Sequence, residues 1–279
     1  MHSFTNTVYC INAACVAPRV IKEISTDRYV LGVTSVDDEL FVLLKRDVNQ
    51  VAVYSVNDYQ LLRHITVLGL TGHWCNDMTS CVRRKCLYMS DNSNSYIHRY
   101  DLSSSDIIRW RVPYIPESLS VTPNCNLLIT CDTNKLVELS ADSGQCVREI
   151  TLQSDIVNPW HSVQLTTGQF VVCHGVGLDI LHRVCVVGDD GNVARSYGGQ
   201  RGSDVGRLSC PCHLAVDKDS QLIFVADECN DRVVLLSPTL EFVRYVSEKL
   251  SRPCRLYLDQ ATRRLFVGQL SGEFIVIQL

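Results

Sequence analysis

The residues best suited to chemistry are polar side chains that recur at matching positions in a repeated pattern. Alignment of the repeated segments on His213 gives one such residue in most segments: Asp77, Ser118, Ser162 and Arg255, with Val30 in the first segment. His161 directly precedes Ser162, so a second imidazole belongs to the same region of the chain. If the segments surround a common axis, these residues meet near its centre. Carboxylate and imidazole groups gathered there would suit a bound metal ion, as in a hydrolase or a lyase.

This set is too sparse for either kind of enzyme. A calcium-dependent hydrolase needs several carboxylate or amide oxygens around one ion, and Asp77 is the one clear carboxylate in the set. A lyase of this type needs a cluster of metal-binding histidines, and His161 beside His213 is too small a cluster. We therefore expect no catalytic residue, no bound metal and no cofactor. A hydrolase or lyase with a metal ion at the centre is the alternative.

The cysteines do not form a convincing zinc site or disulfide framework. The chain has 14 cysteines, and the segment Cys210-Pro-Cys212-His213 supplies a single Cys-x-Cys pair. A structural zinc site usually needs two closely spaced ligand pairs. Several other cysteines fall in or beside strand-like runs, where a free thiol acts as a small buried hydrophobe. The sequence also contains no Asn-x-Ser/Thr acceptor, so we expect reduced thiols and a cytoplasmic protein.

A short motif, two apolar residues followed by a basic residue, recurs along the chain and defines the repeat. It ends at six bases in turn: Lys22, Arg63, Arg109, Arg148, Arg195 and Arg244. Successive bases lie 39 to 49 residues apart, and the segments between them have strand-like composition without a helix signal. A repeat of that length built from strands is typical of propeller blades. The sequence therefore predicts an all-β, six-bladed propeller.

The clearest repeat unit, residues 211–246, predicts the layout of one blade. It contains four β-rich runs separated by turn residues, the pattern of a four-stranded antiparallel meander. Residues 78–94 match this unit without a gap, with Asp91 on Asp227 and Asn94 on Asn230. The recurrent base falls on the outermost strand, where a charge disfavours pairing with another sheet.

The first copy of the motif, which ends at Lys22, precedes the first predicted blade. The last predicted blade ends without a copy of its own. We therefore predict that residues 19–24 supply the outer strand of the last blade, whose third strand is expected near residues 274–279. Such pairing would join the two ends of the ring. The prediction is one domain over residues 1–279, with residues 1–18 as a lead-in.

Charge and hydropathy exclude some classes of partner. The formal net charge is −4 and the pI is near 6.0, which gives no general attraction to a phosphate backbone. We expect no DNA binding. No stretch approaches the roughly 20 apolar residues that cross a bilayer, so we expect no membrane partner.

Two tryptophans precede inner strands of different blades and predict a contact surface. Trp74 follows His73, and Trp160 precedes His161, so both pairs are expected on one face of the ring. Tryptophan beside polar groups is a favoured anchor in protein interfaces. The alternative is that both rings wedge between blades, because large aromatic side chains also dominate cores. The predicted binding face comprises Trp74, Asp77, Ser118, Trp160, His161, His213 and Arg255.

The unit at residues 211–246 resembles the NHL repeat. That family has a proline, an apolar-small-Val-Asp strand, a Val-Ala-Asp strand end and an Asn-x-Arg-Val strand. The corresponding residues here are Pro211, 214–217, 225–227 and 230–233. The glycine-bearing segment 198–206 is similar to the loop between NHL blades. The match by motif is strongest in this blade, whereas the match by period covers the whole ring.

The resemblance implies a recognition module. NHL propellers are most familiar as the carboxy-terminal module of tripartite-motif ubiquitin ligases, where they bind a protein or an RNA. No RING or B-box zinc-ligand series is found, so ligase chemistry is not expected of any residue here. We predict a noncatalytic binding platform for a protein partner. Single-stranded RNA held by tryptophan and arginine stacking is a second alternative.

Overall fold

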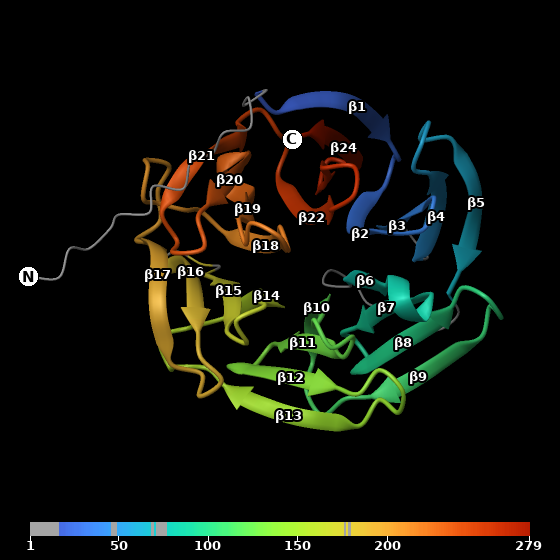
Figure 1. Cartoon of the computed structure of the whole chain (residues 1–279), viewed down its shortest axis with the longest axis horizontal. Coiled ribbons are helices and arrows are strands. Elements are labelled where there is room, and N and C mark those ends of the chain that lie inside the picture. The colour runs from blue at the N-terminus through green and yellow to red at the C-terminus, as the bar shows by residue number, and fades with distance from the viewer. Residues whose placement is uncertain (1–16, 46–48, 68–69, 71–76, 176, 178–179) are drawn as a thin grey trace, which may run out of the picture.

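The computed structural model is an all-β, six-bladed propeller (Figure 1). It describes residues 17–45, 49–67, 70, 77–175, 177 and 180–279. Six four-stranded antiparallel sheets surround a central axis, as the repeat predicted. The helical structure in these residues is two short 3₁₀ turns, η1 (Val82–Arg84) and η2 (Glu228–Asn230). No helix in the described part of the chain is long and apolar enough to cross a membrane.

Each of the first five blades takes its strands in chain order from the axis outward. Blade 1 contains β2 (Tyr29–Val36), β3 (Glu39–Lys45), β4 (Gln50–Ser55) and β5 (Leu61–Thr66). Blade 2 contains β6 (Met78–Cys81), β7 (Cys86–Asp91), β8 (Tyr96–Asp101) and β9 (Ile107–Arg111). Blade 3 contains β10 (Pro116–Val121), β11 (Leu127–Cys131), β12 (Lys135–Leu139) and β13 (Cys146–Thr151).

The remaining blades include the seam of the ring. Blade 4 contains β14 (Pro159–Gln164), β15 (Phe170–His174), β16 (His182–Val187) and β17 (Val193–Gly199). Blade 5 contains β18 (Pro211–Val216), β19 (Ile223–Asp227), β20 (Arg232–Leu236) and β21 (Phe242–Ser247). Blade 6 contains β22 (Pro253–Asp259), β23 (Arg264–Gln269), β24 (Glu273–Gln278) and, as its outer strand, β1 (Arg19–Ser25).

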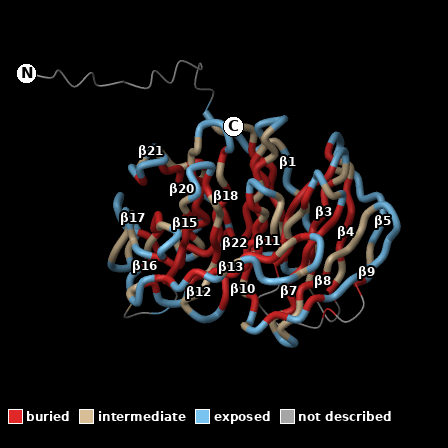
Figure 2. The backbone as a smooth tube through the Cα atoms, turned by 60° about the horizontal axis from the view of Figure 1, so that its bottom comes forward, coloured by how far each residue is buried: buried red, intermediate tan, exposed pale blue. Residues whose placement is uncertain are grey.

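The hydrophobic core lies between neighbouring blades. Most middle strands are short apolar runs that are buried on both faces, as in β19 and β20. One cluster joins Val171 and Val184 of blade 4 to Leu214 and Val225 of blade 5. Exposed residues concentrate on the outer strands and the turns (Figure 2). The blades are therefore held by side-chain packing, since strand hydrogen bonds run only within each blade.

The six recurrent bases all lie on outer strands, as predicted. Arg63 of β5 pairs with Glu39, and Arg148 Nε of β13 lies 2.7 Å from Glu138 Oε2. These pairs keep a charge on the exposed edge of the sheet, which opposes pairing with another strand.

Two blades share a turn built from the same side chains, which confirms the predicted register. Asn230 Nδ2 donates to Asp227 Oδ2 at 2.8 Å in blade 5. Asn94 Nδ2 donates to Asp91 Oδ2 at 2.9 Å in blade 2. The aspartate ends the second strand of each blade, and its bond to asparagine fixes the turn into the third strand.

The opening strand closes the ring in blade 6, in agreement with the prediction for residues 19–24. β1 pairs antiparallel with β24, with Glu23 opposite Ile275 and Ile24 opposite Phe274. Ile21 and Ile24 pack against a buried cluster that includes Phe266, Phe274 and Val276. Without β1, this cluster would lose its outer cover.

Deletion of residues 1–24 should therefore prevent cooperative folding. The truncated chain would expose an unpaired edge of β24 and the apolar cluster beneath β1. We expect binding of a hydrophobic dye and loss of a sharp melting transition in calorimetry. A truncated chain that melts cooperatively at the full-length temperature would contradict this closure.

Two aspartate substitutions in β1 provide a matched control for the deletion. Ile24→Asp places a charge against the apolar cluster and should cost about 2–4 kcal/mol of unfolding free energy. Val20→Asp makes the same change at an exposed residue of the strand and should cost less than about 1 kcal/mol. Urea unfolding of both variants measures the difference.

Candidate functional site

The centre of the ring is lined by six strand edges. β2, β6, β10, β14, β18 and β22 each lie at one end of their sheet, so one side of each has no strand partner. A strand edge carries unpaired backbone N–H and C=O groups, which are costly to bury without hydrogen bonds. The channel therefore needs water, side chains or a ligand to satisfy these groups.

Asp77 is a buried carboxylate in the channel that accepts hydrogen bonds from two backbone N–H groups. Its side chain is 0% exposed, and its Oδ1 and Oδ2 accept hydrogen bonds from the N–H groups of Met78 at 2.8 Å and Leu119 at 2.9 Å. Leu119 belongs to the next blade, so this carboxylate links blades 2 and 3. Burial would raise the pKa of Asp77, but contact with His213 and the charge of Arg255 outweigh it and hold this pKa at about 2.

Two histidines link neighbouring blades in the same way, His161 from blade 4 to blade 5 and His213 from blade 5 to blade 6. His161 Nδ1 accepts from the N–H of Leu214, and His213 Nδ1 accepts from the N–H of Leu256, both at 3.3 Å. Their rings stack with centroids 3.7 Å apart. Burial lowers the pKa of both histidines, to well below the usual value for His161. Both imidazoles are therefore neutral at pH 7, with the proton on Nε2.

Arg255 continues the same pattern across the seam of the ring. Its Nε donates to the carbonyl oxygen of Leu31 in blade 1 at 2.6 Å, and its Nη1 donates to Cys254 O at 2.7 Å. Its Nε also lies 3.4 Å from Asp77 Oδ1. We call Asp77, His161, His213 and Arg255 the channel plug, because each bonds to the backbone of the blade that follows.

Ser118 occupies the corresponding position in blade 3 but forms no side-chain hydrogen bond to the described residues of the next blade. Its Oγ is buried and has no hydrogen-bond partner among the described residues. Blades 3 and 4 are joined by Thr130 and Ser162, whose hydroxyl oxygens are 2.7 Å apart, and by His161 Nε2, which lies 3.3 Å from Leu119 O.

The position equivalent to His213 in blade 4 is His161, so the alignment with Ser162 was wrong by one residue. His161 is opposite Cys173 as His213 is opposite Ala226, in each case directly after an irregularity in the strand register. Four inner strands begin with proline and shift register just after it: those starting at Pro116, Pro159, Pro211 and Pro253. The residue two positions after this proline enters the channel region, a signal that the repeat alignment did not use.

The plug has a possible metal-ligand geometry, but its hydrogen bonds oppose that use. Ligand atoms of Asp77, His161 and His213 lie within 4.8 Å of one another. However, His161 Nε2 lies 3.3 Å from Leu119 O while Nδ1 accepts from Leu214, so both ring nitrogens are engaged. The guanidinium of Arg255 already neutralises Asp77. A cation would have to displace these contacts, so the residues present do not fit a metal well.

The predicted binding face is only partly exposed. Trp74 lies outside the described residues. Trp160 is half-buried and packs against the core cluster between blades 4 and 5 and against the one between blades 5 and 6, as the wedge alternative expects. The other five predicted residues, Asp77, Ser118, His161, His213 and Arg255, are all buried. A partner on this face would therefore contact the surrounding loops before it reached these side chains.

One loop on this face combines exposure with a fixed conformation. Residues 200–209 connect β17 to β18, and Val205 at their centre is 63% exposed. Arg232 is buried beneath this loop and donates from Nη1 to Ser203 O at 2.6 Å and from Nη2 to Arg207 O at 3.0 Å. Its Nε donates to Asp227 Oδ2 at 2.7 Å. We call residues 200–209 the blade-5 loop.

Asparagine and serine add further anchors to the blade-5 loop. Asn230 Nδ2 donates to Gly202 O at 2.9 Å, and the N–H of Ser209 donates to Asp227 Oδ1 at 2.6 Å. The N–H of Gly206 donates to the Tyr197 hydroxyl at 2.9 Å. The sequence likens residues 198–206 to the loop between NHL blades but does not predict these bonds, because most of the partners come from the following turn and strand.

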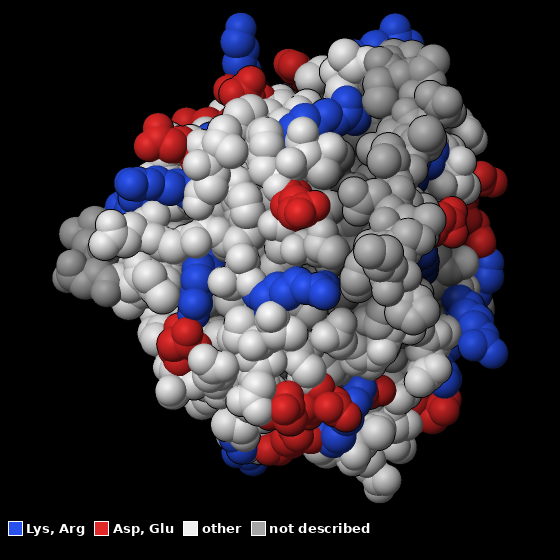
Figure 3. All heavy atoms as spheres, turned by 60° about the vertical axis from the view of Figure 1, so that its left-hand side comes forward, with Lys and Arg blue, Asp and Glu red and all other residues white. Residues whose placement is uncertain are grey.

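Charge on the surface is mixed in sign. On the side that carries β17 and β21, basic and acidic side chains are interspersed and do not form one continuous basic track (Figure 3). A nucleic-acid-binding surface usually gathers its cations on one face. This view therefore offers no support for an RNA path.

The chain is similar in fold to solved structures of enzymes. Virginiamycin B lyase from Staphylococcus aureus is 10% identical with a TM-score of 0.65, over 94% of this chain and 99% of that one. An inactive variant of that lyase, solved with quinupristin, is 11% identical with a TM-score of 0.67 over the same shares. Hydrazine synthase from Kuenenia stuttgartiensis is 12% identical with a TM-score of 0.66, over 92% and 97% of the two chains. At these identities the likeness shows the propeller fold alone.

No family model matches the chain, and no curated protein matches it either.

Removal of the Asp77 carboxylate should destabilise the ring strongly. Asp77→Ala leaves two buried N–H groups without an acceptor and removes the negative charge beside Arg255. We expect a loss of about 3–5 kcal/mol in urea unfolding. Asp142→Ala removes an exposed ion pair with Arg84 and should cost less than about 1 kcal/mol. Equal losses for the two variants would contradict a special role for the plug.

Stability should fall as the solution is acidified below about pH 6.5. Burial lowers the pKa of His98, His161 and His213, and lowers that of His174 to about 4. Between the unfolded value near 6.5 and the folded value, the unfolded chain binds more protons. Each histidine then removes up to about 1.4 kcal/mol of stability per pH unit. Urea unfolding at several pH values between 7.5 and 5 measures this slope.

A glutamine variant tests the contribution of one buried histidine. His174→Gln should reduce the slope by up to one proton, because burial lowers the pKa of His174 to about 4. A stability that does not depend on pH in this range would show that the buried imidazoles are not held neutral.

Proposed function

We propose that the chain is a noncatalytic binding platform that recognises a protein partner through the blade-5 loop. The observation that carries this proposal is a loop with five exposed residues in succession, Ser203 to Arg207, whose backbone is held from below. Exposed loops on a rigid scaffold are the usual carriers of recognition. The fold itself does not distinguish binding from catalysis.

The rigidity of the blade-5 loop favours affinity. A flexible loop loses conformational entropy when a partner orders it, at a cost of about 0.5–1.5 kcal/mol for each immobilised side chain. Arg232 and Asn230 already fix the backbone at Gly202, Ser203 and Arg207. Val205 and Arg207 thus present an apolar and a cationic group on a preformed surface. Arginine is enriched among the residues that dominate binding energy.

The contacts beneath the loop also support the resemblance to NHL propellers. Asp227, Asn230 and Arg232 are the residues that suggested the resemblance, and all three bond to the loop or its end. As part of the same proposal, the chain acts like the substrate-recognition module of a tripartite-motif ubiquitin ligase. It carries the recognition step and no ligase chemistry.

The other functions considered have less support. The plug's ring nitrogens and carboxylate are occupied by the backbone and by Arg255, which disfavours a channel-metal hydrolase or lyase. The mixed charge on the face shown in Figure 3 does not favour a path for single-stranded RNA there. All cysteines of the described residues are free thiols, which supports the proposal of a reducing, cytoplasmic setting.

A charge-reversed loop tests the proposal. The double variant Val205→Asp/Arg207→Glu alters two exposed side chains and leaves the backbone bonds to Arg232 in place. We expect quantitative affinity purification to recover partner proteins with wild type and at least about tenfold less with the variant. Its melting temperature should remain within a few degrees of wild type.

The control carries the same change of charge elsewhere. Val147→Asp/Arg195→Glu alters exposed residues of the outer strands β13 and β17. This control should recover the same partners as wild type. The proposal fails if the loop variant recovers them equally well, or if wild type recovers nothing beyond a bead control.

A further inference from the structure

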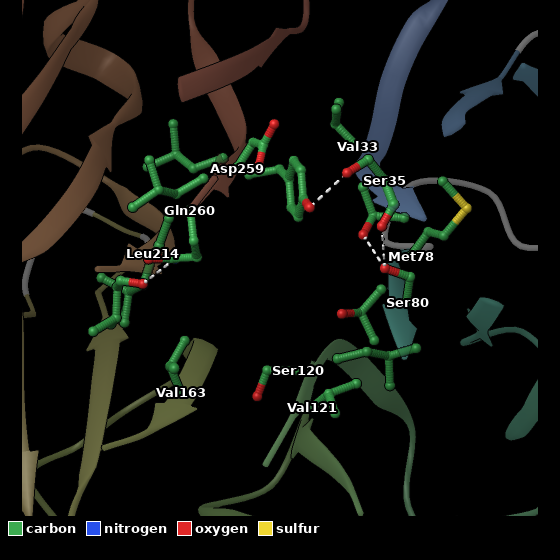
Figure 4. A pocket seen from close by; sticks show the side chains of 18 of the residues that line it. Val33, Ser35, Met78, Ser80, Ser120, Val121, Val163, Leu214, Asp259 and Gln260 are labelled. Carbon is green, nitrogen blue, oxygen red and sulfur yellow. Dashed lines mark hydrogen bonds between the residues drawn. The ribbon is translucent and has the colours of Figure 1, made fainter. Parts of the chain in front are cut away.

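The central channel is hollow on the side opposite the blade-5 loop. A cavity of about 430 Å³ is lined by the second halves of the inner strands, beyond the channel plug (Figure 4). His161 and His213 form its floor, and residues that follow the inner strands, such as Asp37 and Lys218, form its rim. Its volume lies within the range of about 300–1,000 Å³ that is usual for small-molecule sites.

Hydroxyl groups line the wall of this cavity. Thr34 and Ser80 share a hydrogen bond at 2.6 Å, and Ser35 and Tyr257 share one at 2.7 Å. These four side chains come from three different blades, so they form an arc around the axis (Figure 4). A hydroxyl that donates to its neighbour still has lone pairs with which to accept from a ligand.

Ser120 completes the wall with an unused group. It lines the cavity from β10, is 8% exposed, and its Oγ has no hydrogen-bond partner among the described residues. A buried hydroxyl without a partner costs about 1–3 kcal/mol. In Figure 4 Ser120 lies beside Val121 on blade 3, and no dashed hydrogen bond reaches it. This group is therefore available to a ligand in the channel.

The part of the cavity inside the ring is lined by uncharged side chains. Among the described residues that line it, charged side chains occur only at or beyond the strand ends, at Asp37, Lys218 and Asp259. Asp37 is already paired with Lys85. The two imidazoles on the floor are neutral, for the reason given above. An ion would lose its hydration here without gaining a counter-charge, so a charged ligand is disfavoured.

We propose that this cavity binds a small uncharged polyhydroxy molecule of the monosaccharide class. Such a molecule both donates and accepts hydrogen bonds, as the hydroxyl wall and the strand edges require. Its apolar C–H faces can lie against the aliphatic residues that separate the hydroxyls, such as Val33 and Val163. The site is separate from the blade-5 loop, because the two lie at opposite ends of the inner strands.

Titration with defined probes tests this site. Glucose and myo-inositol are the uncharged probes, and glucose 6-phosphate is the charged comparison. Saturation-transfer NMR and calorimetry with the full chain should show saturable binding of an uncharged probe at millimolar concentration. Ser120→Leu fills the cavity and should weaken binding at least about tenfold. Ser120→Ala removes one hydrogen-bonding group and should weaken it about three- to tenfold.

Ser196→Leu is the matched control, since it makes the same change at an exposed residue of β17 and should leave binding unchanged. Circular dichroism establishes that each variant is folded, and Ser120→Ala decides the question if Ser120→Leu does not fold. The proposal is overturned if neither uncharged probe binds saturably, or if Ser120→Ala binds as well as wild type. Tighter binding of glucose 6-phosphate than of glucose would also overturn it.

Discussion

The structure depends on the hydrogen bonds that the channel plug makes to unpaired strand edges. A ring of sheets places one edge of each inner strand on the axis, where the backbone groups are far from bulk water. Asp77, His161, His213 and Arg255 meet this requirement, and each does so in the following blade. The same groups therefore remove a desolvation cost and fix the spacing between blades, two tasks that apolar side chains could not perform together.

The plug also explains why polar residues that looked functional are buried. Sequence alignment correctly brought Asp77, His213 and Arg255 to the same level of the ring, because that level follows from the repeat. It could not show that each side chain turns to a neighbouring blade, since the backbone partner is 42 or 43 residues away in sequence for Asp77 and His213 and 224 residues away for Arg255. His161 was displaced by one position because polar Ser162 and Gln164 occupy the positions of apolar Leu214 and Val216, so a match of apolar residues shifts the alignment by one.

Other parts of the fold could be predicted from the sequence because they depend on residues close together in the chain. The number of blades, the outer-strand bases and the closure by residues 19–24 all depend on local composition repeated at a regular interval. The Asp-Asn turn at 91–94 and 227–230 uses side chains three residues apart, so its spacing is visible directly. The order of the blade-5 loop could not be predicted, because it comes from Arg232, whose contacts span more than 20 residues. The channel cavity belongs to no single segment and has no sequence signal of its own.

The seam between β1 and β24 gives the ring a defined mechanical weak point. The two strands are antiparallel, so Arg19 and Gln278 lie opposite each other at the same end of blade 6. Tension applied through these two residues would separate the strands from that end and break their hydrogen-bonded pairs one after another. In all other hydrogen-bonded pairs of the six sheets, the two strands follow each other in the sequence, so the connecting segment also holds them together. Force on the molecule would therefore detach β1 from blade 6 before any other strand left its sheet.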